Sequence, residues 1–583
     1  MTFALQHRTL AIVGVLLLLA WPLVFSSAYD LRVFGLAGIY AILVLGYQFI
    51  FGHAGALALT QGMFFGLAAY ITAILGTRFG LPATATLPLA IIGPVLVAAI
   101  VALPVLRLET HYFALATLGL AQIAFLVAVK WEGITGGANG IAGVPPLVLF
   151  GVAVPNGLPM VIAIWSCVAL CALVAWRSMR GIYGRAFEVM RANPLIAGAI
   201  GLDSGRMRLA AFLAGAAYAG LAGALHAHML RVVSPEVLEF PVMVACLSMA
   251  VVGGRTRVAG AILGAVLLVH LPEWLRGFES YYLIVYGAVL LAMIIAAPEG
   301  LAGLLDSFMR APGKPALESK NAEPSTGSAQ GSPLLQLHKV SKRFGGVRAL
   351  REVGFTVAGG EIIGLIGQNG SGKTTLLNLI SGLYPADEGR LVFAGEDIGA
   401  ARPFQIARRG IGRSFQRIGL VDEMSAIDNV AVAYAGRTDR PPWFIASFSG
   451  GPLATARARA LSQLDALGIA QHAWERAGAL PQGIRRKIEI ARALALSPRL
   501  LLLDEPAAGL TPAEMTDLAA RLRGLSAQGI ALLVVEHNMT FLLPLADRVV
   551  CLEGGAMIAD GSPQEIRRNA AVLAAYLGTE PAP

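Results

Sequence analysis

The chain has 583 residues, of which 56% are hydrophobic and only 14% are charged, and its mean hydropathy is +0.68. These values exclude a protein that is soluble along its whole length, so part of the chain is predicted to lie in membrane lipid. The formal net charge of +9 is attributed to arginines beside apolar runs, and no nucleic acid is expected as a partner. The four cysteines form no CxxC pair, which favours small buried residues over disulfides or a metal site.

Residues 1–308 are predicted to form a polytopic α-helical membrane domain. Runs long enough to cross a hydrocarbon core of roughly 30 Å lie at 10–25, 31–50, 61–76, 84–106, 111–130, 158–176, 209–229 and 281–297. The run at 241–271 differs, because VVGGRTRVAG interrupts it with paired glycines and arginines. We expect a broken or re-entrant pair of helices there, with Gly253 and Gly254 as candidates for lining a polar path.

The orientation follows from the basic loop at 177–208, which is expected to be cytoplasmic. Its arginines are Arg177, Arg180, Arg185, Arg191, Arg206 and Arg208. An even number of predicted spans precedes this loop, so the N-terminus is predicted to be cytoplasmic too. The first run ends in FSSAYD, where Ser26 and Ala28 resemble a signal-peptidase site, but a long polytopic sequence follows and a first span is favoured.

A change in composition divides the chain after the last apolar run. Residues 309–332 are rich in Pro, Gly, Ser and charged residues without apolar periodicity, which predicts a flexible linker. Residues 333–583 begin with strand-like alternation and then pass through a strand, a glycine loop and a helix. This order predicts an α/β P-loop NTPase domain.

The glycine loop carries the strongest motif of the chain. GQNGSGKT matches GxxxxGKT, with the strand EIIGLI before it and a helical segment after it. Glycines let successive backbone N–H groups cradle phosphate oxygens, Lys373 adds a cation at the β- and γ-phosphates, and Thr374 offers a hydroxyl to Mg²⁺. The predicted nucleotide-binding residues here are Gly367, Asn369, Gly370, Gly372, Lys373, Thr374 and Thr375.

A second motif lies about 130 residues further on. In RLLLLDEPAAGLTP an apolar strand ends in Asp504 and Glu505. A buried strand end can hold a carboxylate near Mg²⁺ and an adjacent general base rigidly, so Asp504 is predicted to bind the metal and Glu505 to be the base.

With these motifs in place, residues 334–583 resemble the ATP-binding subunits of ABC transporters. Gln416 in GRSFQR matches the Q-loop glutamine, His537 in LLVVEHNM the switch histidine, and Phe344 in SKRFGG the aromatic residue that stacks on adenine. AGLTP, at 508–512, stands where the D-loop lies. The resemblance implies an ABC-type fold, ATP as cofactor, catalysis by Glu505, His537 and Gln416, and Mg²⁺ held by Thr374, Gln416 and Asp504.

The signature of that family is altered here. Where LSGGQ is typical, this chain has LPQGI, with Leu480 and Gly483 retained, Pro481 at the serine position and Gln482 between them. Proline suits the first turn of a helix but offers neither a hydroxyl nor an N–H group to a phosphate. We therefore expect the two ATP sites of a dimer to be unequal, because one of them would face this signature.

The membrane half resembles the permease of the branched-chain amino acid importers over residues 31–305. The matching stretches are LRLETHYFALATLGLAQI, GITGGANGIAG, GRAFEVMRANPLIAGAIGLD and GAILGAVLL, and PAAGLTP and the ending AAYLG of the soluble half agree. The chain thus resembles a permease fused to its ATPase. The resemblance implies a multi-pass protein of the bacterial inner membrane with a cytoplasmic ATPase domain.

The resemblance also implies partners and a coupling segment. The expected partners are a second permease subunit, a second ATP-binding subunit and a periplasmic solute-binding protein. GIYGRAFEVMRANP is expected to be the coupling helix that docks near the Q-loop, with Arg185, Glu188 and Arg191 as contacts. The alternative is a basic cluster that sets membrane orientation and has no mechanical role.

The solute is left open by the sequence. In GHAGALALTQGMFFGLAAY, the residues Ala56, Ala58, Thr60 and Gln61 replace those at the polar positions of the family pattern, so leucine-type specificity does not follow from this stretch. A branched-chain amino acid is the favoured solute, with urea or a small carboxylate as alternatives. An exporter half-transporter and a mechanotransmission ATPase are less favoured, because the loops are short and no large external segment is present.

Overall fold

The computed structural model describes residues 27–108, 110–149, 151–276, 281–303, 333–437 and 451–577. The apolar run at 10–25, Ser26 and the linker at 309–332 lie outside them, so their predictions stay predictions. The chain divides into two compact units. The first holds residues up to Ser178 together with Gly205–Gly313, and the second holds Met179–Ser204 together with the chain from Lys314. The loop at 179–204 thus groups with the second unit, although the predicted domain at 1–308 included it.

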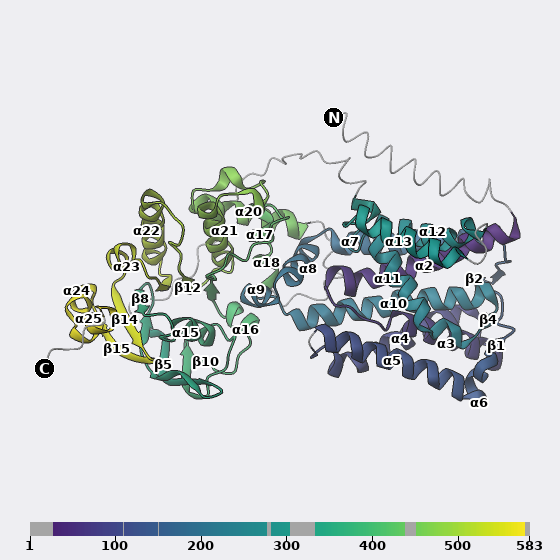
Figure 1. The fold of residues 1–583 in the computed structure, drawn as a ribbon, viewed down its shortest axis with the longest axis horizontal. Coiled ribbons are helices and arrows are strands. Elements are labelled where there is room, and N and C mark those ends of the chain that lie inside the picture. The colour runs from purple at the N-terminus through teal and green to yellow at the C-terminus, as the bar shows by residue number, and fades with distance from the viewer. Residues whose placement is uncertain are drawn as a thin grey trace. The chain divides into compact units, whose positions relative to one another are not determined.

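The first unit is helical, and each described apolar run of the sequence forms a helix (Figure 1). Its long helices are α2 (Ala28–Tyr47), continued by the π-helix η1 (Gln48–His53), α3 (Gln61–Arg78), α4 (Ala83–Val105), α5 (Thr110–Lys130), α7 (Leu158–Met179), α10 (Ser204–Leu230) and α13 (Tyr282–Ala296). Six described helical segments are long and apolar enough to cross a membrane, namely Ala28–His53, Ala83–Val105, His111–Lys130, Leu158–Met179, Ser204–Leu230 and Ile284–Gly303. The apolar helix α3 is not among the six, so the number of spans stays a prediction.

Short elements join these helices at one end of the unit. They are α6 (Glu132–Thr135), the 3-10 turns η2 (Gly137–Asn139) and η3 (Pro235–Leu238), and the strands β1 (Ile141–Ala142), β2 (Val148–Leu149), β3 (Val152–Ala153) and β4 (Val232–Val233). β1 pairs with β4, and β2 pairs with β3, both antiparallel. Gly140 has a φ of 67°, and a Cβ there would lie 2.1 Å from the Val233 carbonyl oxygen. The glycine is therefore required by this close approach.

The interrupted run at 241–271 forms two helices, as predicted, α11 (Phe240–Gly253) and α12 (Val258–Trp274). The buried Gln48 amide donates to the carbonyl oxygens of both Gly254 and Arg257, each at 2.9 Å. A Cβ at Gly52 would lie 1.8 Å from the Arg255 carbonyl oxygen. The Gly254 and Arg257 carbonyls at the break are therefore satisfied by Gln48. The role of Gly253 and Gly254 in lining a polar path stays a prediction.

The second unit is built on a six-stranded sheet with the order β11 (Ile411–Arg413), β12 (Leu500–Asp504), β13 (Ala531–Val535), β8 (Ile362–Gly367), β14 (Arg548–Glu553) and β15 (Ala556–Gly561). All its pairings are parallel except β14 with β15. β12, β13 and β8 are fully buried apolar runs, as expected for strands covered on both faces. Their carboxyl ends lie at one edge, where ligands bind in such sheets.

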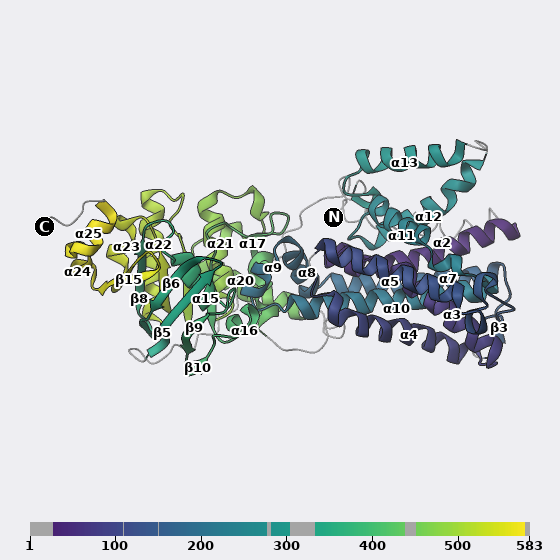
Figure 2. The same ribbon diagram turned by 60° about the horizontal axis from the view of Figure 1, so that its bottom comes forward.

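A second, antiparallel sheet completes the core (Figure 2). It consists of β10 (Glu396–Asp397), β9 (Glu388–Phe393), β5 (Pro333–Phe344) and β6 (Val347–Val353), with β7 (Thr356–Ala358) paired to β5. Helix α15 (Lys373–Ile380) contributes Leu376 and Leu377 to the apolar cluster shared by both sheets. This packing fixes the start of α15 against the end of β8.

The remaining helices of the second unit are α8 (Ile182–Ala192), α9 (Pro194–Ala199), α16 (Pro403–Arg408), α17 (Ala426–Ala431), α18 (Ala433–Gly436), α20 (Gly451–Ala466), α21 (Gln482–Leu494), α22 (Pro512–Ala527), α23 (Met539–Leu545), α24 (Pro563–Arg568) and α25 (Ala570–Leu577), with the 3-10 turns η5 (Ala470–His472) and η6 (Ala477–Ala479). α17, α20 and α21 pack together, while α8 packs on α18 and α20, and α9 packs on α16. These last contacts explain why the loop at 179–204 belongs to this unit. The four cysteines of the chain are free.

Candidate nucleotide site

The glycine loop joins β8 to α15 as the motif predicts. Gly370 and Gly372 have φ angles of 84° and 103°, which L side chains rarely adopt. A Cβ at Gly372 would also lie 2.6 Å from the Ala349 carbonyl oxygen. The buried Lys373 ammonium donates to the carbonyl oxygens of Gly367 and Gln368 at 2.7 and 2.8 Å, and burial lowers its pKa. The loop thus holds a cation at a helix N-terminus, where anions bind.

The predicted acidic pair stands at the end of β12. Asp504 is buried, and burial raises the pKa of its carboxyl while the nearby Arg413 guanidinium opposes that shift. Glu505 follows with a φ of 49°, in the left-handed region that non-glycine residues seldom occupy. Its backbone N–H donates to the Val535 carbonyl at 2.9 Å. The glutamate side chain is therefore presented from a constrained turn.

The three residues predicted to be catalytic meet at one oxygen atom. The Gln416 amide donates to Glu505 Oε1 at 3.1 Å, and His537 Nε2 lies 3.2 Å from the same atom. Gln416 follows β11, and His537 follows β13, so the two strands that flank β12 bring them together. The three side chains come from positions far apart in the sequence, and their catalytic roles stay predictions.

These groups open into one pocket of about 490 Å³. It is lined by Val347, Arg348, Ala349, Arg351, Asn369, Gly370, Ser371, Gly372, Lys373, Thr374, Thr375, Gln416, Asp504, Glu505, Val535, His537 and Gly554. Most residues predicted from the glycine loop and the acidic pair are therefore brought together in one cavity of ligand size. Gly367 and Phe344 are not in its lining.

Phe344 lies at the end of β5 with its side chain partly exposed. Its ring stands edge-on to Tyr384, with the centroids 5.1 Å apart, and the Lys342 ammonium lies 5.5 Å from its centroid. An exposed aromatic ring can stack on a base. The adenine-stacking role of Phe344 stays a prediction.

The altered signature lies at the start of α21. Pro481 stands at the N-cap with φ −57° and ψ 154°, one position before the first turn in which it was predicted. A proline tolerates this place because no intrahelical bond needs its N–H group. A Cβ at Gly483 would lie 2.8 Å from Glu514 Oε1, and one at Gly509 would lie 3.1 Å from the Gln482 amide. The signature therefore abuts the D-loop segment of its own chain.

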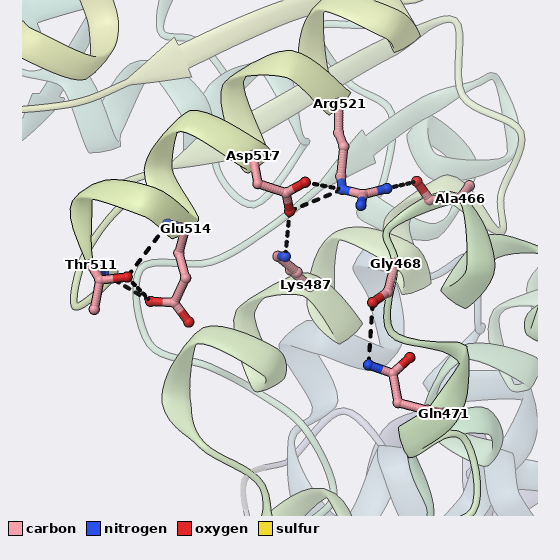
Figure 3. A network of polar contacts seen from close by, with 8 residues as sticks. All are labelled: Ala466, Gly468, Gln471, Lys487, Thr511, Glu514, Asp517 and Arg521. Carbon is pink, nitrogen blue, oxygen red and sulfur yellow. Dashed lines mark hydrogen bonds and ion pairs between the residues drawn. The ribbon is translucent and has the colours of Figure 1, made fainter.

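Polar contacts continue from there along α22 (Figure 3). Thr511 and Glu514 form a reciprocal capping box, in which the Thr511 N–H donates to Glu514 Oε2 at 2.8 Å. Asp517 accepts from Lys487 of α21 at 2.7 Å and from Arg521 at 2.9 Å. Arg521 also donates to the Ala466 carbonyl at 2.7 Å. The network ties α22 to α21 and to the end of α20.

The predicted coupling segment forms the amphipathic helix α8. Arg185 Nε lies 3.1 Å from Asp428 Oδ2 of α17, and Arg457 of α20 holds both oxygens of the same carboxylate at 2.7 and 2.9 Å. Burial of Asp428 favours its protonated form, but these arginines outweigh burial and lower its pKa. Burial raises the pKa of Glu188, and Arg191 lies in the last turn of α8.

A buried carboxylate beside the histidine, that of Glu536, was not predicted from the sequence. Glu536 Oε1 accepts from the Ala507 N–H at 2.7 Å, and its Oε2 accepts from the His537 N–H at 3.2 Å. Burial raises the pKa of Glu536. It thus joins the turn after Glu505 to the turn that carries His537. An acidic residue ending an apolar strand directly before the predicted histidine was the available signal.

Two further contact residues were also missed. Asp428 was not predicted as the partner of Arg185. Arg413 is buried, donates to Ser381 Oγ and lies 4.8 Å from the Phe415 ring centroid. The only local indication of a role for Arg413 was its position at the end of a buried strand, three residues before Gln416.

The donor set suits a small hard cation. Thr374, Gln416 and Asp504 line the same pocket and provide a hydroxyl, an amide carbonyl and a carboxylate. Oxygen ligands of this kind, completed by phosphate oxygens and water, are those that Mg²⁺ prefers. These residues therefore fit the predicted metal.

Family models match both halves of the chain, and known proteins match part of it. Residues 31–297 match the family model for the permease component of branched-chain amino acid transport systems, 350–508 match that of ABC transporters, and 556–582 match that of branched-chain amino acid ATP-binding cassette transporters. The chain is 36% identical over 252 residues to the high-affinity branched-chain amino acid transport ATP-binding protein BraF of Pseudomonas aeruginosa, covering 42% of this chain and 98% of BraF.

Two other known proteins are similar to part of this chain. LivG of Escherichia coli K12, a protein of the same description, is 35% identical over 258 residues, covering 42% of this chain and 98% of LivG. A solved ATP-binding cassette of an ABC transporter in its ADP conformation is 30% identical with a TM-score of 0.38, covering 42% of this chain and all of that cassette.

Proposed function

Because the chain belongs to the branched-chain amino acid ABC transporter family and joins its permease and ATP-binding halves, we propose that it imports a branched-chain amino acid at the expense of ATP. The chain is a multi-pass membrane protein whose second unit is an ATPase coupled to transport. The observation that carries the proposal is the convergence of Gln416 and His537 on Glu505 in a pocket continuous with the phosphate-binding loop.

In the proposed reaction, ATP lies in the pocket with its phosphates against the glycine loop. Lys373 neutralises charge on the β- and γ-phosphates, and the backbone N–H groups of the loop hold their oxygens. Glu505 accepts a proton from the attacking water, and His537 contacts the γ-phosphate. Gln416 links the γ-phosphate to the membrane domain. Thr374, Gln416 and Asp504 would hold Mg²⁺, which would supply positive charge to the phosphate oxygens.

The proposed coupling of hydrolysis to transport runs through the loop at 179–204. Because this loop connects α7 and α10 of the permease yet packs within the ATP-binding unit, motion of that unit is transmitted to both helices. Arg185 on α8 is anchored by Asp428, which supports a mechanical role over a merely orienting basic cluster.

The proposed assembly lies in the bacterial inner membrane with the N-terminus and the ATPase in the cytoplasm. One chain supplies one permease and one ATPase, so the importer contains a second permease subunit and a second ATP-binding subunit. A periplasmic solute-binding protein delivers the amino acid.

We further propose that the two ATP sites are unequal. ATP held here by Lys373 faces the partner's signature, while ATP on the partner faces Pro481, which provides no hydroxyl. Replacing the catalytic glutamate of one subunit at a time in the purified complex tests this. Glu505→Gln should remove most of the hydrolysis, whereas the equivalent change in the partner should remove less, and equal losses would refute the proposal.

Uptake into cells tests the function as a whole. Cells lacking the chain and cells with Glu505→Gln should both lose uptake of labelled leucine or valine, while wild-type cells retain it. Urea and a small carboxylate serve as comparison solutes. If only the uptake of urea or of the carboxylate were lost, that solute and not the amino acid would be the substrate. No change for any solute, with ATP hydrolysis intact in the complex, would contradict import.

A further inference from the structure

We propose that Ile196, in the short helix α9, is the positioning residue through which the permease loop moves the signature helix α21. The inference rests on the proposed function, since it concerns how hydrolysis and transport are coupled. It assigns the transmitting contact to an apolar side chain in α9, whereas the sequence pointed to the charged residues of α8.

The contact is a side chain inserted at a glycine. Ile196 is buried, and a Cβ built at Gly419 would lie 1.7 Å from Ile196 Cδ1 and 3.0 Å from its Cγ1. Gly419 does not have a positive φ, so its backbone conformation does not demand glycine. The glycine is needed because the tip of Ile196 occupies the place of a side chain. Gly419 lies three positions after Gln416.

The residues around Gly419 are held to α21 by buried charges. Arg492 donates to the Gly419 carbonyl at 2.8 Å, and Arg486 donates to the carbonyls of Phe415 and Gln416 at 2.6 and 2.9 Å. Glu489 accepts from the Phe415 N–H at 3.2 Å and pairs with Arg486 at 3.0 Å. The three charged side chains are almost completely buried. Hydrogen bonds to buried ions are strong, so segment 415–419 and α21 form one block.

The other side of the contact is equally well fixed. Asn193 caps α9, accepting from the N–H groups of Leu195 and Ile196 at 3.0 and 3.3 Å. Behind α9, Arg408 donates to the carbonyls of Gly201 and Gly436 at 3.1 and 2.9 Å. A displacement of the permease loop is therefore passed to Gly419 by a rigid helix. The same block carries the signature at the start of α21 and Gln416 at the catalytic pocket.

Charge pairing by α8 is a weaker transmitter. Arg185 is one quarter exposed, and its partner Asp428 is already held by Arg457. Because the Arg185 end of this pair is in contact with water, the pair constrains α8 less than a fully buried contact does. An interdigitated apolar contact in a close-packed interior resists displacement in both directions.

Cross-linking in the full chain tests the contact without knowledge of the solute. Gly419 and Ile196 Cγ1 are close enough that the two Cβ atoms lie no more than about 4.5 Å apart, within the span of a disulfide. A protease site is inserted in 309–332, so that cleavage separates the membrane half from the ATP-binding half. In membranes, mild oxidation of I196C/G419C should form a disulfide that keeps these two halves together after cleavage. Leu195 is 60% exposed on the same helix, so L195C/G419C is the matched control. Halves that separate in both variants would overturn the contact.

A size exchange then tests transmission in the complete complex. Gly419→Ala should lower solute uptake per ATP hydrolysed at least tenfold, because Ile196 is pushed out, while hydrolysis stays within about threefold. Ile196→Ala should lower it several-fold. In the double variant I196A/G419A the methyl introduced at position 419 takes the place of the removed Ile196 tip. The contact is thus refilled, and at least half of the uptake lost in Gly419→Ala should return. Leu195→Ala and Gly524→Ala, whose added Cβ meets no atom within 4 Å, should match wild type.

The outcomes separate this inference from the proposed function. The role of Ile196 would be refuted if Gly419→Ala left solute uptake at the wild-type level. It would also be refuted if uptake fell in Gly419→Ala and did not recover in I196A/G419A. Absence of wild-type uptake of any tested solute would refute the proposed function, and the cross-link would still decide the contact.

Discussion

The two units keep polar groups in their interiors in different ways. In the described part of the first unit, no Asp, Glu, Lys or Arg is buried, and the buried polar side chains are Gln, Thr, Ser and His. In the described second unit, Lys373, Asp504, Arg486, Glu489 and Arg492 are all buried. A buried charge costs more in lipid, where water is remote. Uncharged amides therefore donate hydrogen bonds to free backbone carbonyls between the membrane helices, whereas buried charged side chains position the catalytic groups.

The largest effect is expected on ATP hydrolysis, when the ionised carboxylate of Glu505 at the catalytic pocket is replaced. Glu505→Gln should lower ATP hydrolysis at the site that contains Lys373 about 10²–10⁴-fold, because a general base is lost. Binding of a fluorescent ATP analogue should persist, since Lys373 and the glycine loop are unchanged. Lys373→Ala is the counterpart that should abolish binding. Steady-state hydrolysis and nucleotide titration measure the two effects, and unimpaired hydrolysis in Glu505→Gln would remove Glu505 from the mechanism.

The next largest effect is expected at the buried charged residues of α21, which are Arg486, Glu489 and Arg492. Glu489→Ala leaves two buried arginines without their carboxylate and should lower the free energy of unfolding by about 3–5 kcal/mol. Asp397 pairs with Arg390 at 2.8 Å, but both side chains are about half exposed or more. Asp397→Ala should therefore cost less than about 1 kcal/mol. Denaturant unfolding of the purified chain measures both, and equal costs would show that burial of the triad does not matter.

A smaller effect is expected at the anchor of α8. Asp428→Asn weakens its bonds to Arg185 and Arg457 and should cost about 1–3 kcal/mol. The pKa of Asp428 is lowered in the folded state, so its contribution is complete above the ordinary range of an aspartate. It should disappear as the pH falls through the lowered pKa. Thermal unfolding of both proteins from pH 7 to pH 3 should show the gap closing, and a constant gap would exclude the ion pairs as its cause.

The smallest effect is expected in the membrane unit. Gln48→Leu removes the two bonds to Gly254 and Arg257, at about 0.6 kcal/mol for each bond in such surroundings. Gly52→Ala at the same break should cost more, because its Cβ would meet the Arg255 carbonyl. Gly119→Ala, with no atom within 4 Å of its Cβ, is the control. Thermal unfolding in detergent ranks the three variants, and a Gln48 effect as large as that of Glu489 would break the contrast between the units.

Features written in contiguous residues could be predicted. The glycine loop, the acidic pair at the end of β12, the helices at apolar runs and the interruption of the run at 241–271 each depend on neighbouring residues. The structure agrees with the sequence on each of these elements. The chemical roles of the residues are still predictions.

Features that join distant segments could not be predicted. Gln48 and Gly254 are 206 residues apart, and nothing around either one indicates that the amide would close the break. Glu489 and Phe415 are 74 residues apart. The residues Arg486, Glu489 and Arg492 recur at a spacing of three, which marks one helix face but does not tell whether that face meets water or a backbone. Only the tertiary fold decides such contacts.

The loop at 179–204 also bears on how the protein is made. Arg185 and Asp428 are separated by 243 residues, so the ribosome delivers the loop long before its receptor. At 5–20 residues per second, the wait lasts roughly 10–50 s. During that time the apolar face of α8 and the side chain of Ile196 have no receptor to cover them. Synthesis as one polypeptide shortens this exposure, because the receptor emerges already tethered to the loop that it will bind.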